Sequence, residues 1–223
     1  LRAEGVALPQ LSVLASVAST EPLPEVFSGA AADGRFAFRR RADGGYSLAA
    51  GATHGFFLGP DALRHARAFV PTLRKGWRST RLRPAAPQGF PDAWGTPRRW
   101  SPDGPSPFEA LRVLDPPPDM QVLAGVQDAF GAAFPSLGKP QLRATWAGMI
   151  DTMPDVVPVI DRVERVPGLV LATGFSGHGF GIGPGAGRVA ATLVTGDDPG
   201  HDLRRFRLDR FTDGSRLELG PSL

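Results

Sequence analysis

The chain has 223 residues, of which 42% are hydrophobic and 21% charged, so it is long and apolar enough to bury a globular core. It contains no cysteine, which excludes disulfides, thiolate catalysis and cysteine-ligated zinc. The formal net charge is +3, and the short arginine runs do not form the dense basic stripe of a general nucleic-acid binder. We therefore expect no nucleic-acid partner.

In the first 80 residues the pattern predicts two strand regions and a helix. Residues 8–20 mix β-branched and small residues in near alternation, which is typical of a strand with one covered face. Residues 36–48 predict a hairpin around Asp43-Gly44, because glycine readily takes the positive φ of a tight turn. Residues 62–75 have helical spacing, with Pro71 as a break or a kink.

The second half of the chain predicts another helix and then a change of character. The helix is expected from about 119 to 134, followed by strands at 141–150 and 156–160. Residues 168–173 are almost wholly apolar, which is typical of a strand buried on both faces in a parallel or mixed sheet. Residues 188–196 predict a helix with a glycine stop.

The segment between that apolar strand and the last helix indicates a ligand site. Seven of its fourteen residues, 174–187, are glycine, so the backbone can approach a flat ligand without intervening Cβ atoms. The first amides of the following helix would present partial positive charge to a cofactor or an anion. Gly181, Gly183 and Ala186 match G-x-G-x-x-A, but Pro184 lies inside the match. The alternative is a turn that only packs the helix against a sheet.

Three further features of the sequence concern localisation, metal binding and the start of the chain. No apolar stretch reaches the roughly 18 residues needed to span a bilayer, so we expect a cytoplasmic protein without a membrane partner. The four histidines lie far apart and lack H-E-x-x-H spacing, so we expect no metal site. The chain begins with Leu1, which indicates either a trimmed start or a piece of a longer polypeptide.

Two motifs with matching spacing resemble the FAD-dependent D-amino acid oxidase / sarcosine oxidase superfamily. One is G-F-S-G-H-G-F at residues 174–180. The other is W-A-G-M-I-D-T-M-P-D-V-V-P-V-I at residues 146–160, which is similar to the family segment W-x-G-x-x-x-x-x-P-D-x-x-P-x-I. With the tail at 201–211, the resemblance covers about residues 141–211, and the hairpin upstream is compatible with the family's substrate domain.

The resemblance implies an α+β fold. Residues 1–150 would form a substrate-binding domain with a large, mainly antiparallel sheet and flanking helices. Residues 151–200 would form the C-terminal strand-loop-helix segment of a discontinuous Rossmann-like FAD-binding domain, and residues 201–223 a C-terminal tail. The partner of this chain would be the missing N-terminal FAD-binding half, which carries the family's G-x-G-x-x-G.

The implied activity is FAD-dependent oxidation of a C–N bond by hydride transfer to flavin. The substrate would be a small amine, or a D-amino or N-methyl amino acid. The alternative is a non-catalytic binding or structural domain derived from this family. The isolated chain is expected to be inactive, because it lacks the unit that holds the pyrophosphate of FAD.

The resemblance also implies site residues, although it assigns no catalytic one. Flavin contacts are expected from eight consecutive residues, Gly174, Phe175, Ser176, Gly177, His178, Gly179, Phe180 and Gly181. Their amides would stabilise anionic reduced flavin, and His178 would either fix the loop or transfer protons. Substrate contacts are expected from Tyr46, Met149 and Ile150, with an ordinary strand tyrosine as the alternative for Tyr46.

The familiar carboxylate anchors of the family are missing here. The D-amino acid branch places an arginine where this chain has Ile150, and sarcosine oxidase-like members place a lysine where it has Gly181. Their flavin-linking cysteine falls near Gly148, so FAD is expected to bind non-covalently. A substrate carboxylate would need another arginine, such as Arg40, unless the substrate is not a simple α-amino acid.

Overall fold

The computed structural model describes residues 1–101 and 103–220, which fold as two compact units. Unit 1 comprises Leu1–Ser12, Pro60–Gly76 and Ile150–Leu223, and unit 2 comprises Val13–Gly59 and Trp77–Met149. Each unit is described separately below. None of the helices in the described ranges is long and apolar enough to cross a membrane.

Unit 2 is built on one sheet, which holds seven strands in the described residues. In chain order they are β1 (Leu11–Thr20), β2 (Ala30–Ala32), β3 (Phe36–Arg40), β4 (Tyr46–Ala50), β5 (His54–Phe57), β6 (Thr80–Arg83) and β7 (Leu142–Thr152). The spatial order is β2-β3-β4-β1-β5-β6, and β7 also pairs with β1. Strand β1 is antiparallel to β4 and β5, while β5 and β6 run parallel. The expected α+β fold with a large, mainly antiparallel sheet is confirmed.

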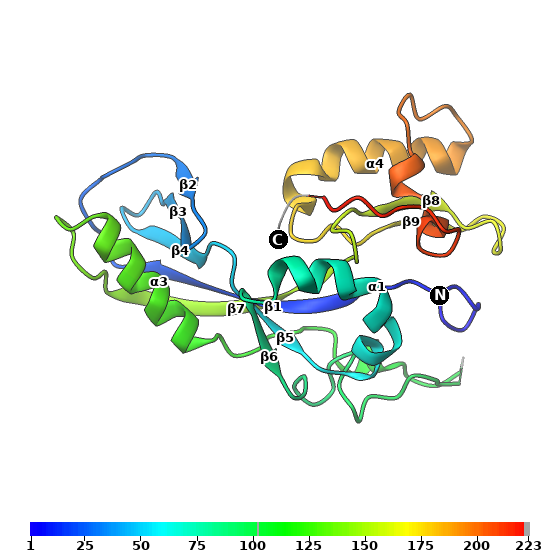
Figure 1. The fold of residues 1–223 in the computed structure, drawn as a ribbon, viewed down its shortest axis with the longest axis horizontal. Helices are drawn as coiled ribbons and strands as arrows, with labels where there is room; N and C mark the ends of the chain where they lie inside the picture. Colours follow the sequence, from blue (N-terminus) through cyan, green and yellow to red (C-terminus); the bar gives the residue numbers. More distant parts are fainter. Residues whose placement is uncertain (102, 221–223) are drawn as a thin grey trace. The chain divides into compact units, whose positions relative to one another are not determined.

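Helix α3 (Met120–Ala133) covers one face of the β3–β4 hairpin (Figure 1). Asp119 caps this helix, because its side chain accepts hydrogen bonds from the amides of Gln121 and Val122. Alternate residues of both strands point to the helix, namely Phe36, Phe38, Tyr46 and Leu48. With Val126 and Phe130 of α3 they form the largely aromatic core of unit 2. The short helix α2 (Pro107–Ala110) begins with a capping box at Ser106.

Unit 1 contains helix α1 (Pro60–Gly76) and an antiparallel pair of strands, β8 (Val159–Arg162) and β9 (Val170–Thr173). Helix α4 (Gly179–Thr195) packs on this pair through Ala186 and Val189, which contact Ile160 (Figure 1). A second cluster consists of Val6, Met153, Val159, Val163, Leu171 and Leu208. Two short 3-10 turns follow, η1 (Arg204–Phe206) and η2 (Leu208–Phe211).

Several elements differ from the sequence-based expectation. Strand β9 is only partly buried and, within the described residues, pairs with β8 alone, so it is not the fully buried parallel strand that its apolar run predicts. Helix α4 begins at Gly179 instead of residue 188, because its first turns dock through Ala186. Helix α1 continues through Pro71. The short elements β2, β5, β6 and α2 were not predicted.

Candidate functional site

The turn that follows β9 packs so closely on its neighbour that it has no room for a side chain. Gly174 has φ +75°, and a Cβ atom there would lie 2.3 Å from Cγ of Met153 and 2.5 Å from its sulfur. The Met153 side chain is itself fully buried. Both the positive φ and the close approach therefore require glycine at this position.

Ser176 fixes the same turn from within. It is fully buried and has φ 52°, which is unusual for a residue other than glycine. Its hydroxyl accepts a hydrogen bond from the Met153 amide at 3.3 Å and donates one to the carbonyl oxygen of Gly174 at 3.2 Å. Ser176 thus positions the turn, and its hydroxyl is already engaged.

A buried ion pair holds the segment on which this turn rests. The side chains of Asp155 and Arg210 are each 4% exposed, and two hydrogen bonds of 2.8 and 3.0 Å join the guanidinium to the carboxylate. Arg210 also donates to the carbonyl oxygens of Val157 at 2.6 Å and Arg207 at 2.7 Å. Asp155 is part of the P-D-x-x-P motif of the sequence, but no sequence signal identifies its partner Arg210, 55 residues further on.

The first turn of α4 leaves two backbone amides without an acceptor in the part of the chain that the structure describes, those of Gly179 and Phe180. The helix is initiated at His178, whose carbonyl oxygen accepts hydrogen bonds from the amides of Gly181 at 3.1 Å and Ile182 at 3.2 Å. The imidazole of His178 makes no capping hydrogen bond. This turn therefore concentrates the positive end of the helix dipole on free N–H groups.

The start of α4 also lacks side chains over much of its surface. A Cβ atom added at Gly181, Gly183 or Gly185 would meet no heavy atom within 4 Å. The backbone is therefore accessible to a planar ring, while the side chain of Phe180 is wholly exposed beside it. Free amides and a bare backbone are chemically compatible with the carbonyl-bearing edge of a flavin.

Ile150 lies next to this loop. A Cβ atom built on Gly177, whose φ is +81°, would lie 3.6 Å from Cγ2 of Ile150. The residue before it, Met149, is half-buried on β7 and belongs to unit 2. Phe175 and His178 of this loop, together with other residues of unit 1, line a shallow cavity of about 260 Å³.

Tyr46, which the resemblance offered as a substrate contact, is a core residue. It is fully buried, its hydroxyl accepts a hydrogen bond from the Val26 amide at 2.9 Å, and its ring packs against Phe38 and Phe130. Strand alternation places it on the face that α3 covers. A buried phenol whose oxygen is engaged exposes no atom to a substrate, so the structure favours the alternative role of an ordinary strand tyrosine.

Arg40, the arginine named for a substrate carboxylate, is also engaged in the fold. Its guanidinium lies 4.7 Å from the centre of the Tyr46 ring and donates a hydrogen bond of 3.0 Å to the carbonyl oxygen of Leu23. Glu25 approaches it at 3.8 Å. These contacts make Arg40 a packing residue of the hairpin.

Comparison with curated proteins finds oxidases of N-methylated amino acids among the relatives. Human peroxisomal sarcosine oxidase is 34% identical over 102 residues, which cover 45% of this chain and 25% of that enzyme. N-methyl-L-tryptophan oxidase of Salmonella agona is 32% identical over 106 residues, covering 45% of this chain and 28% of that enzyme.

Solved structures with the same fold are also found. L-amino acid deaminase from Proteus myxofaciens, in complex with anthranilate, superposes with a TM-score of 0.82 at 29% identity, covering 94% of this chain. The deaminase from Proteus vulgaris gives 0.81 at 26% identity, covering 92% of this chain. The chain spans 46% and 47% of these two structures, that is, less than half of each.

A family model described as "FAD dependent oxidoreductase" matches residues 2–193. The match includes the hairpin of unit 2, the P-D-x-x-P segment, the glycine turn and nearly all of α4. The chain therefore belongs to the DAO family of FAD-dependent oxidoreductases.

Proposed function

We propose that this chain forms the substrate-binding part and the C-terminal flavin-contacting part of an enzyme that oxidises a C–N bond. Unit 2 would bind the substrate, and unit 1 would supply the loop from Gly174 to Gly181 that contacts the flavin. The family supports the class of reaction. The names of the relatives support an amino acid with a primary or N-methylated amine, because they include sarcosine, N-methyl-L-tryptophan and L-amino acids.

The residues of this chain would hold the cofactor without reacting themselves. The free amides of Gly179 and Phe180 would donate hydrogen bonds to a flavin carbonyl oxygen, and the helix dipole would favour the negative charge of the reduced ring. Bound FAD would supply the hydride acceptor for the carbon that bears nitrogen; the nitrogen would lose a proton, and water would hydrolyse the resulting imine. Because the sequence has no cysteine and Gly148 stands at the family's linking position, attachment would be non-covalent.

The observation that carries this proposal is the contrast between the two sides of the glycine turn. Its inner side is locked, since Gly174 packs on Met153 and the Ser176 hydroxyl is engaged with the same residue. Its outer side ends in free amides and in glycines with open space above them. A turn that served only for packing would need the first feature but not the second.

Absorption spectroscopy of the full-length protein tests the proposal. The purified protein should be yellow, release intact FAD on denaturation and bleach under anaerobic conditions when a suitable amino acid is added. A correctly folded but colourless protein would refute it. Stable FAD that no amine or amino acid reduces would support the non-catalytic alternative.

A second experiment tests whether the N-terminal half is needed. Residues 1–223 alone are expected to lose FAD during gel filtration, because the pyrophosphate-binding unit of the family is not among them. Stoichiometric FAD retained by this piece would contradict that expectation and would show that the glycine turn and α4 are sufficient for binding.

A further inference from the structure

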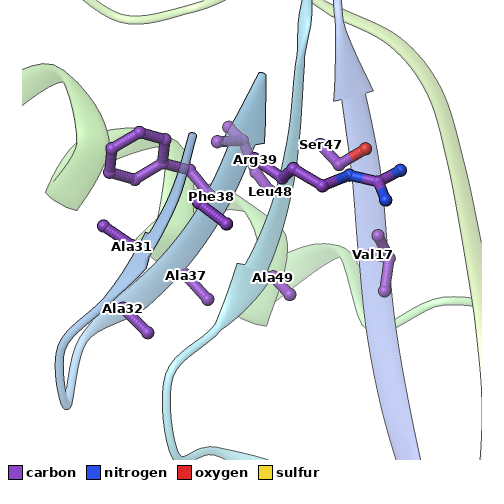
Figure 2. Close-up of a pocket in the computed structure, with 10 residues that line it drawn as sticks. Val17, Ala31, Ala32, Ala37, Phe38, Arg39, Ser47, Leu48 and Ala49 are labelled. Atoms are coloured by element: carbon purple, nitrogen blue, oxygen red, sulfur yellow. The ribbon is translucent and has the colours of Figure 1, made fainter. Parts of the chain in front are cut away.

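The face of the β3–β4 hairpin opposite to α3 carries a shallow concavity of about 420 Å³. Three alanines of this face, Ala32, Ala37 and Ala49, line much of it, together with Val17 of β1 (Figure 2). It lies wholly within unit 2.

The concavity results from the alternation of side chains along the two strands. Phe38 and Leu48 are paired across the hairpin and point to the α3 side. Ala37 and Ala49, which form the next pair, point to the other side. The open face carries alanines, whereas the covered face carries large side chains. A hollow therefore remains on the open face, which a bulkier pair of residues would fill.

Arg39 supplies the charge at this hollow. It is exposed, and no carboxylate within the described ranges contacts it. The other arginines of the hairpin are paired: Arg35 with Asp33, Arg40 with Glu25, and Arg41 with Asp43. In Figure 2 the Arg39 side chain extends across β4, with Ser47 and Val17 beside its guanidinium. Ser47 is the direct cross-strand partner of Arg39.

We propose that Arg39 binds the carboxylate of an α-amino acid substrate, with the Ser47 hydroxyl as an additional donor, and that the alanine hollow accommodates an apolar part of that substrate. A guanidinium offers a planar pair of donors that matches the two oxygens of a carboxylate. The alanine and valine lining offers no hydrogen-bonding partner to a charged substrate side chain, whose burial would be unfavourable. The inference rests on the proposed function and adds to it the residue that binds the substrate carboxylate and a preference for apolar substrate side chains.

Anthranilate is a suitable probe, because it carries a carboxylate on an apolar ring. Its affinity for the full-length, FAD-loaded protein would be measured by titration calorimetry beside that of anthranilamide, its uncharged analogue. Arg39→Met should weaken anthranilate binding by about 10- to 100-fold, the effect of losing hydrogen bonds to a charged group. Anthranilamide binding should weaken much less, because its carbonyl oxygen is a neutral acceptor. Arg39→Lys should give an intermediate loss, because it keeps the charge but not the planar fork.

Arg35→Met is the matched control, since it removes a guanidinium from the start of the same strand region but one that Asp33 already holds. It should leave both affinities unchanged. Equal losses for the two probes in Arg39→Met, or no loss for anthranilate, would overturn the inference. So would a change of oligomeric state in that variant, which would assign the hollow to contact with a second copy.

Flavin content and amino acid oxidation are measured separately from anthranilate affinity, so that failure of the anchor and failure of the proposed function can be distinguished. A protein that binds FAD and oxidises an amino acid, but whose anthranilate affinity is insensitive to Arg39→Met, would refute the anchor and leave the proposed function standing. A protein without flavin would refute the proposed function itself. Ala37→Leu adds a second measurement: filling the hollow should raise KM for substrates with large side chains, and glycine-sized substrates should be unaffected.

Discussion

Replacing Arg210 by Met should destabilise unit 1 strongly, because it leaves a buried carboxylate without its counter-charge. Asp155 is 4% exposed and would keep a single side-chain hydrogen bond, from the Val157 amide at 3.2 Å. Removing one partner of a buried ion pair costs about 3–5 kcal/mol. For a cooperative unit of about the length of this chain, each kcal/mol corresponds to about 2–4 °C, so the melting temperature of the transition that includes unit 1 should fall by about 6–20 °C.

Differential scanning calorimetry of the full-length protein would measure this effect beside two further variants. Arg204→Met is the control, because that side chain is 85% exposed and its ion pair with Asp202 is a surface pair, whose removal should cost about 0–1 kcal/mol. Combining Arg210→Met with Asp155→Asn should restore part of the lost stability, since the uncompensated charge is then gone.

The same variant should also loosen the glycine turn. Asp155 lies two residues beyond Met153, whose amide donates the hydrogen bond to Ser176. FAD should therefore dissociate more readily from Arg210→Met during gel filtration. A melting temperature within about 2 °C of the Arg204→Met value, or no recovery in the double variant, would refute the reasoning from burial.

Three other predictions follow from single contacts. Gly174→Ala should lower the free energy of unfolding by about 2–5 kcal/mol, because φ is positive there and the new Cβ atom would clash with buried Met153. Gly181→Ala should not lower it, since a Cβ atom at that position meets open space. Thermal unfolding of both variants checks this. Asp119→Ala should cost about 1–3 kcal/mol by removing the α3 cap and two arginine contacts. Burial raises the pKa of Asp119, but hydrogen bonds from a helix amide and from the arginines lower it by more, so the net pKa is below the ordinary value. The ionised side chain therefore contributes its full stabilisation above pH about 4, and this contribution is lost as pH falls through the folded-state pKa. In urea titrations at acid pH, the free energies of unfolding of wild type and variant should converge. Tyr46→Phe should cost about 1 kcal/mol by leaving a backbone amide without its acceptor and should leave KM unchanged; a raised KM at unchanged stability would instead place Tyr46 at the substrate.

Elements with strong local signals could be predicted from the sequence. The helices expected at 62–75 and 119–134 correspond to α1 and α3, and the hairpin turns at Gly44, whose φ is +83°. Each depends on information within a few neighbouring residues, such as the Asp119 cap or the helical spacing of apolar residues. The family motifs in the second half of the chain were equally local.

The start of α4 could not be predicted in the same way. Glycine disfavours helix, so a segment with glycine at alternate positions is typical of a loop, yet the helix begins at Gly179. Docking of Ala186 and Val189 on Ile160 outweighs the local preference. The sequence alone determined that a glycine-rich segment follows β9. Tertiary packing decided that the later part of this segment is a helix start with free amides.

The candidate substrate residues show the same division. Strand alternation in the sequence determines that Tyr46 and Ser47 lie on opposite faces of the hairpin, as do Arg39 and Arg40. It does not determine which face a helix will cover. That is decided when α3, some 80 residues further along the chain, packs on Tyr46 and leaves Arg39 at an open hollow, because the burial of a strand face depends on long-range contacts that local sequence does not contain.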